Sequence, residues 1–166
     1  MTSTDIGKSI DRNTIIKAGF VLALIIFLVI VYKSGSAKDI DLAVISDRLE
    51  NEMGIEKEMK KASDRDVMEF FGLDSGSFEQ VVYYRNTREL AVEELLIVKA
   101  ASKDALGPVS EAADRRTKTQ IDVYKSYGPK QVKQLENCIK IEKGNYYFYC
   151  TSDNAADYEE VFRDAI

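Results

Sequence analysis

The longest apolar run in the chain, AGFVLALIIFLVIVY, extends from Ala18 to Tyr32 and contains no charged residue. With the two isoleucines that precede Lys17, the apolar span covers eighteen residues. As a helix it would extend about 27 Å, close to the roughly 30 Å hydrocarbon core of a bilayer. Lys17 and Lys33 can extend their ammonium groups to the headgroups, and Tyr32 occupies an interfacial aromatic position. The pattern predicts a transmembrane helix over residues 15–33, with the lipid bilayer as its partner.

A cleavable signal peptide is the main alternative for this segment. Lys8, Arg12 and Lys17 would form its charged region, and the small residues 34–37 would allow cleavage near Ala37 and release of a secreted form. A buried helix of a soluble domain is rarely apolar all round. Basic residues are equally frequent on the two sides of the segment, so they do not set its orientation. A short tail before a large C-terminal domain favours a signal-anchor, with that domain outside the cell membrane.

The rest of the pattern predicts a disordered tail over residues 1–14, a linker over residues 34–38 and one domain over residues 39–166. Capping residues and apolar residues at helical spacing predict helices in four places, with a short helical link at Lys130–Leu135. The first helix begins at Asp39 or Asp41, and the second follows the cap Ser63. The third covers Ser102–Tyr127, and the fourth covers Ala155–Ala165.

Strands are predicted where β-branched and aromatic residues cluster between turn residues, at Phe78–Arg85, Ala91–Ala100, Cys138–Lys143 and Tyr146–Thr151. The apolar core of the second strand is continuous, which is typical of a strand covered on both faces. The predicted fold class is therefore α+β, in the order α-α-β-β-α-β-β-α. Its domain would contain a four-stranded antiparallel sheet of two hairpins, packed with helices.

Gly144-Asn145 is typical of a two-residue type II′ turn, which would place Cys150 opposite Ile139 in the last hairpin. Directly opposed residues share a sheet face, so Cys138 and Cys150 would point to opposite faces. Both cysteines are therefore predicted to be free, with no disulfide. A three-residue loop would instead place them opposite each other and allow a bridge.

Three strings of the sequence resemble a known bacterial family. They are VVYYRNTRELAVEELLIVKA, the long charged helix after it, and YGPKQVKQLENCIKIEKGNYYFYCTSDNA. The chain is similar in this way to domain of unknown function 4358, found mostly in Firmicutes, over roughly residues 39–165. The resemblance implies a small envelope protein behind an N-terminal lipoprotein signal or membrane anchor. It implies no catalytic or binding residue, and this chain lacks the cysteine that the lipoprotein members carry after their apolar segment.

Composition narrows the chemistry that the domain can perform. The chain contains no histidine and no tryptophan and carries a net charge of −5. Histidine-assisted nucleophiles and most zinc sites are therefore absent, and an acidic domain is poorly suited to bind nucleic acid. We expect no cofactor, no metal site and no catalytic residue.

Two sets of side chains remain as candidates for function. The carboxylate pairs Glu93 with Glu94 and Asp153 with Asp157 are candidates for acid–base chemistry, although Asp153 is better explained as part of a helix cap. The abundant tyrosines could form a stacking surface for a glycan or peptide, but burial at the core edge explains them more simply.

These observations favour a membrane-anchored extracytoplasmic module that binds an envelope protein or a wall glycan and is not an enzyme. The alternative is an envelope hydrolase that uses paired carboxylates. Adjacent strand residues such as Glu93 and Glu94 point to opposite faces, so that pair could not share a cleft without a third carboxylate.

We expect thiol counting under denaturing, non-reducing conditions to find two free thiols per chain. A chain of monomeric mass with no free thiol would instead show an intramolecular bridge between Cys138 and Cys150, and hence a longer loop than Gly144-Asn145.

Overall fold

The computed structural model describes the backbone of residues 12–35 and 37–166, and the side chains of residues 15–28 and 37–166. The chain divides into two compact units, with the boundary after residue 36. The first unit consists of helix α1 (Arg12–Gly35), which includes the segment predicted to span a membrane. Among the described residues, no helix combines the length and the apolar character needed to cross a bilayer. The structure therefore supports a helix in this segment without supporting a transmembrane span; residues 1–11 of the predicted tail lie outside the described residues.

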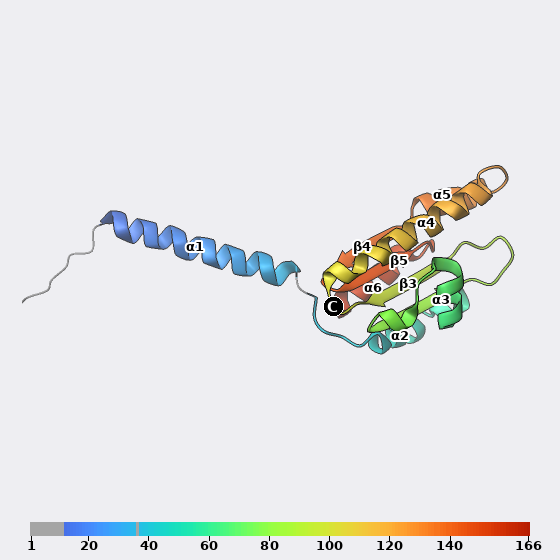
Figure 1. Ribbon diagram of the computed structural model, residues 1–166, viewed down its shortest axis with the longest axis horizontal. Coiled ribbons are helices and arrows are strands. Elements are labelled where there is room, and N and C mark those ends of the chain that lie inside the picture. The colour runs from blue at the N-terminus through green and yellow to red at the C-terminus, as the bar shows by residue number, and fades with distance from the viewer. Residues whose placement is uncertain (1–11, 36) are drawn as a thin grey trace, which may run out of the picture. The chain divides into compact units, whose positions relative to one another are not determined.

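The second unit, residues 37–166, is an α+β domain built on a five-stranded antiparallel sheet (Figure 1). The strand order is β1-β2-β3-β5-β4, so the two predicted hairpins join through a β3–β5 pair. The strands are β1 (Lys60–Lys61), β2 (Gln80–Arg85), β3 (Glu94–Lys99), β4 (Ile139–Lys143) and β5 (Tyr146–Cys150). The α-helices of this unit are α2 (Leu42–Asn51), α3 (Asp64–Phe71), α4 (Gly107–Tyr124), α5 (Pro129–Glu136) and α6 (Ala155–Ala165).

Helices cover both faces of the sheet, because alternate residues of the central strands are apolar on both sides. On one face, Leu95 and Ile97 of β3 and Phe148 of β5 pack with residues of α2 and α6. On the other face, Leu96 and Val98 of β3 pack with residues of α3 and α4. Every residue of β3 is buried. This agrees with the continuous apolar run, which predicted a strand covered on both faces. The core therefore has two halves, separated by the sheet.

Most predicted helix boundaries agree with the structure. Asp41 caps α2 by accepting a hydrogen bond from the backbone N–H of Ala43 at 2.8 Å. Ser63 and Asp66 form the predicted capping box at the start of α3. Helix α6 occupies the predicted range, and its Tyr158, Val161 and Phe162 are buried.

The prediction of four strands is wrong, because a short fifth strand, β1, pairs with β2 at the sheet edge. Its two residues, Lys60 and Lys61, are both exposed lysines, so they carry neither the apolar alternation nor the β-branched side chains that identify a strand. The long helix predicted over Ser102–Tyr127 is also shorter. It is preceded by a 3-10 helix at Lys103–Leu106, and α4 begins at Gly107, which places Pro108 in the first turn where its missing N–H is tolerated.

The last hairpin has the predicted register, with Lys143 opposite Tyr146 and Ile139 opposite Cys150. Gly144 has a φ of +60°, and Asn145 is not among the described residues with positive φ, which fits a type II′ turn. Both cysteines are free, and they pack into different halves of the core. Burial raises the pKa of the Cys150 thiol to about 12, so Cys150 behaves as a small apolar side chain.

Replacing Gly144 with alanine should destabilise the domain. An alanine at this position would keep the positive φ, which is strained for a residue with a side chain. Its Cβ would lie 2.8 Å from the Cβ of Ala37. We expect G144A to lower the free energy of unfolding by about 1–3 kcal/mol in urea titrations. The matched control is G107A, where nothing lies within 4 Å of the added Cβ and φ is −50°. A G144A variant as stable as the wild type would contradict the assigned turn.

Candidate functional site

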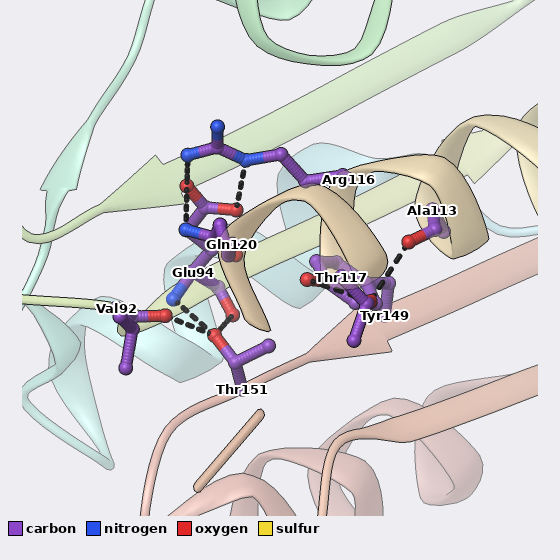
Figure 2. A network of polar contacts seen from close by, with 8 residues as sticks. All are labelled: Val92, Glu94, Ala113, Arg116, Thr117, Gln120, Tyr149 and Thr151. Carbon is purple, nitrogen blue, oxygen red and sulfur yellow. Dashed lines mark hydrogen bonds and ion pairs between the residues drawn. The ribbon is translucent and has the colours of Figure 1, made fainter. Parts of the chain in front are cut away.

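A buried ion pair links the first residue of β3 to the middle of α4. Glu94 is only 3% exposed, and the helical spacing of Arg116 and Gln120 brings both side chains to its carboxylate (Figure 2). Arg116 donates from Nε to Oε2 of Glu94 at 3.1 Å and from Nη2 to Oε1. Gln120 donates from Nε2 to the same Oε1 at 3.5 Å. The pair is thus a two-pronged guanidinium–carboxylate contact that ties α4 to the sheet.

Glu94 favours the charged state of Arg116. Burial of Arg116 opposes its charge, but the hydrogen bond and negative charge of Glu94 outweigh this effect, so the pKa of Arg116 is raised. Burial, and then the charge of Glu94, also raise the pKa values of Tyr83 and Tyr149, so both phenols stay neutral. Because an ion removed from water is costly unless it is paired, each member of the pair depends on the other.

The polar network extends from Glu94 to the neighbouring strand β5 (Figure 2). Thr151, just after β5, accepts the backbone N–H of Glu94 at 2.8 Å and donates to the carbonyl of Val92. Thr117 of α4 donates to the carbonyl of Ala113 at 2.8 Å and lies 3.3 Å from the hydroxyl of Tyr149. These contacts fix the start of β3 and the adjacent turn of α4 together.

Arg116 also lines a surface groove of about 320 Å³ between α4 and the loop that joins β2 to β3. The groove contains three guanidinium groups, those of Arg85, Arg88 and Arg116, and none of its described lining residues is acidic. Its complete lining is Arg85, Asn86, Arg88, Leu90, Ala91, Arg116, Thr119, Gln120, Val123 and Tyr124. In a chain with a net charge of −5, this is a local concentration of positive charge.

Phe70 of α3 contacts two of these guanidinium groups. The Cζ atoms of Arg85 and Arg116 lie 4.3 Å and 4.8 Å from the centre of its ring. At such distances each cation is attracted to the aromatic ring. Stacking on Phe70 therefore limits the orientations that both arginines can adopt.

The loop wall of the groove is ordered by its own hydrogen bonds. Asn86, which is buried, accepts the backbone N–H of Arg88 at 2.9 Å and its Nε at 3.3 Å, and donates to Glu93 at 3.0 Å. Leu90 is the only non-glycine residue of the described chain with positive φ, at +59°. Gln131 of α5 donates to the carbonyl of Leu90 at 3.2 Å, which holds this strained turn beside the groove.

A second polar cluster surrounds Glu58, and it has a structural role. The carboxylate accepts hydrogen bonds from Ser152 at 2.8 and 3.0 Å, Asn154 at 3.2 Å and Tyr158 at 3.0 Å. Burial, and then the hydrogen bond to Glu58, raise the pKa of Tyr158. Asn154 is the N-cap residue of α6, but its side chain makes no capping hydrogen bond. The backbone N–H of Asn154 donates to the hydroxyl of Ser152. The cluster fastens the start of α6 to the segment after α2.

The structure places the two candidate carboxylate pairs, Glu93 with Glu94 and Asp153 with Asp157, as follows. Glu94 is bound to Arg116, whereas the half-buried Glu93 accepts a hydrogen bond from Asn86. Asp153 and Asp157 are both exposed, and no described group of histidine, cysteine and acidic residues could hold a metal ion. Lys17 is an exposed residue of α1, while the side chains of Tyr32 and Lys33 lie outside the described residues.

Sequence reasoning missed the groove because its residues are far apart in the chain. Arg85 ends β2 and Arg88 lies in the loop that follows, whereas Arg116 and Gln120 lie one helical turn apart in α4. The only sequence signal was a polar arginine and glutamine on the face of a helix that otherwise packs on the core. Most of the tyrosines belong to the core, as the simpler interpretation predicted, since Tyr83, Tyr84, Tyr146, Tyr147 and Tyr149 are buried.

The fold and the groove define a small α+β domain with a basic surface site and no assembled catalytic carboxylates in its described part. Residues 51–152, more than half of the chain, match the family pattern of domain of unknown function 4358 (DUF4358). The chain therefore belongs to this family. The match covers the segment that carries the β2–β3 loop, Glu94 and α4. No curated protein and no solved structure matches the chain.

Removing one member of the buried pair should be costly. We expect Arg116→Met to lower the free energy of unfolding by about 3–5 kcal/mol, because it leaves the Glu94 carboxylate buried without its cation. The double variant E94L/R116M should recover much of this loss, since an apolar pair has no uncompensated charge. Urea unfolding of both variants tests this. Equal destabilisation by the single and double variants would contradict a tightly coupled pair.

Proposed function

We propose that this protein is a membrane-anchored, extracytoplasmic binding module whose N-terminal helix holds a ligand-binding domain at the cell envelope. The proposal combines an anchor, α1, with the domain of residues 37–166 and its basic groove. In this account the domain binds and does not catalyse.

The exposure of apolar side chains along α1 is the observation that carries the proposal. Nine consecutive residues from Phe20 to Leu28 include eight large apolar or aromatic side chains, and each of these eight is at least 51% exposed. At 100° per residue, nine residues pass round the helix more than twice, so every side of α1 is apolar between Phe20 and Leu28. A bilayer would cover such a surface on all sides, whereas packing on a protein core would cover one stripe. Within α1, the last residue whose side chain is described is Leu28, and the sequence continues without a charge to Tyr32.

The chemistry of the domain supports binding over catalysis. The chain has no histidine, and its buried carboxylate Glu94 is already occupied by Arg116. Cys150 is buried with a raised pKa, which makes it a poor nucleophile at neutral pH. The groove, by contrast, presents arginine side chains, which are well suited to bind an anion.

We propose that the domain lies outside the cell, as in a signal-anchor protein. The partner of the domain is then a component of the envelope, either a protein or a wall polymer. Nucleic acid is disfavoured by the net charge of −5.

Membrane fractionation combined with protease treatment tests the proposal. We expect the full chain to stay in the membrane pellet after high-salt and carbonate washing, and residues 37–166 to be digested when protease is added to intact cells. A matched control variant with L24K, I25K and L28K should leave the pellet, because each lysine at mid-span opposes insertion by about 2.5–3.5 kcal/mol.

Two outcomes would contradict the proposal in different ways. A shorter soluble protein beginning near Ala37 would show that the segment is a cleaved signal peptide. Complete protection of the domain from protease in intact cells would place it on the other side of the membrane.

A further inference from the structure

We propose that the groove formed by Arg85, Arg88, Arg116 and Gln120 binds the phosphate group of a phosphorylated polyol, with glycerol phosphate as the simplest representative. The inference rests on the proposed function, since it names the ligand of the binding module. It is argued from the charge of the groove and from two buried polar atoms that lack partners.

The first step concerns uncompensated charge. Glu94 neutralises Arg116, but neither Arg85 nor Arg88 forms a salt bridge within the described residues. Two positive charges therefore face the groove without a carboxylate at salt-bridge distance, in a wall that contains no described acidic residue. An anionic ligand would supply the missing counter-charge.

The second step concerns Arg85. Its Nε is buried and has no hydrogen-bond partner among the described residues, while its guanidinium stacks over Phe70. A buried donor without an acceptor costs about 1–3 kcal/mol, so an acceptor arriving in the groove would be stabilised. Guanidinium groups match phosphate oxygens in two-pronged contacts, and a phosphate offers more oxygens to several arginines than a carboxylate does.

The third step concerns Gln120, which is 7% exposed and lines the groove. Its Nε2 donates to Glu94, but its Oε1 is buried without a partner. The amide orientation is fixed by Glu94, because an oxygen turned toward the carboxylate would repel it. Oε1 can only accept, so the ligand needs a hydrogen-bond donor, such as a hydroxyl, as well as an anion. A phosphorylated polyol carries both groups, and sulfate carries no donor.

Phosphorus-31 NMR tests the proposal on the full chain in a maltoside detergent. We expect the resonance of sn-glycerol 3-phosphate to broaden with the wild-type protein, and glycerol alone not to compete. Arg88→Gln, an exposed substitution, should weaken binding about tenfold or more, because it removes a charge-assisted contact worth about 1.5–3 kcal/mol. The matched control is Lys133→Gln, which removes one exposed charge from a different pocket and should leave binding unchanged. Unfolding curves of both variants separate lost binding from lost structure.

Two further arms identify the ligand more closely. Gln120→Met should abolish the preference for glycerol phosphate over sulfate in competition, because it removes the acceptor without changing the charge. Glycerophosphoglycerol, a phosphodiester, distinguishes the possible sources of the ligand. Binding of this diester indicates a polymer or a lipid headgroup, whereas binding of the monoester alone indicates a free metabolite.

The proposal fails if the wild-type chain does not broaden the resonance, if K133Q weakens binding as much as R88Q, or if Q120M keeps the full preference over sulfate. These results would leave the membrane-fractionation test of the proposed function unaffected. Conversely, release of inorganic phosphate from bound glycerol phosphate would support the site and contradict the non-catalytic role.

Discussion

The structure depends on β3, the strand that is hydrogen-bonded on both edges and covered on both faces. It pairs with β2 on one side and β5 on the other, and Leu95 to Val98 contribute alternately to the two halves of the core. No residue of this strand contacts solvent over more than a tenth of its surface. Because all backbone and side-chain groups of β3 are used internally, the helices on both faces and the loops at its ends are positioned relative to it.

The candidate site is a consequence of where this strand begins. Glu94 is the first residue of β3 and would be an unpaired buried carboxylate without Arg116. The pair fixes the rotation of α4, so that Gln120 lines the groove and Arg116 stacks on Phe70. The same pairing removes Glu94 from acid–base chemistry. The interaction that holds α4 on the sheet therefore also places Gln120 beside Arg116 in the wall of the groove.

Much of the fold could be predicted because its signals are local. The Ser63 capping box, the Gly144-Asn145 turn and the continuous apolar run of β3 each depend on neighbouring residues. Strand β1 could not be predicted, since two exposed lysines join the sheet only because β2 offers a free edge. The groove was missed for a similar reason: its arginines come from the end of β2, the loop after it and α4, and only tertiary packing brings them together. The separation of Glu93 from Glu94 was expected for adjacent residues, but the partner of Glu94 could not be predicted, because it lies 22 residues away.

Amide hydrogen exchange of the full chain, read residue by residue, tests the central role of β3 most directly. We predict that the amides of Leu95 to Val98 exchange only through global unfolding, with protection free energies equal to the unfolding free energy from urea titration. The amides of the edge strand β1 should exchange faster, through local opening. Exchange of the β3 amides at free energies well below that of global unfolding would contradict the account, because a strand that opens locally could not position both the core and the groove.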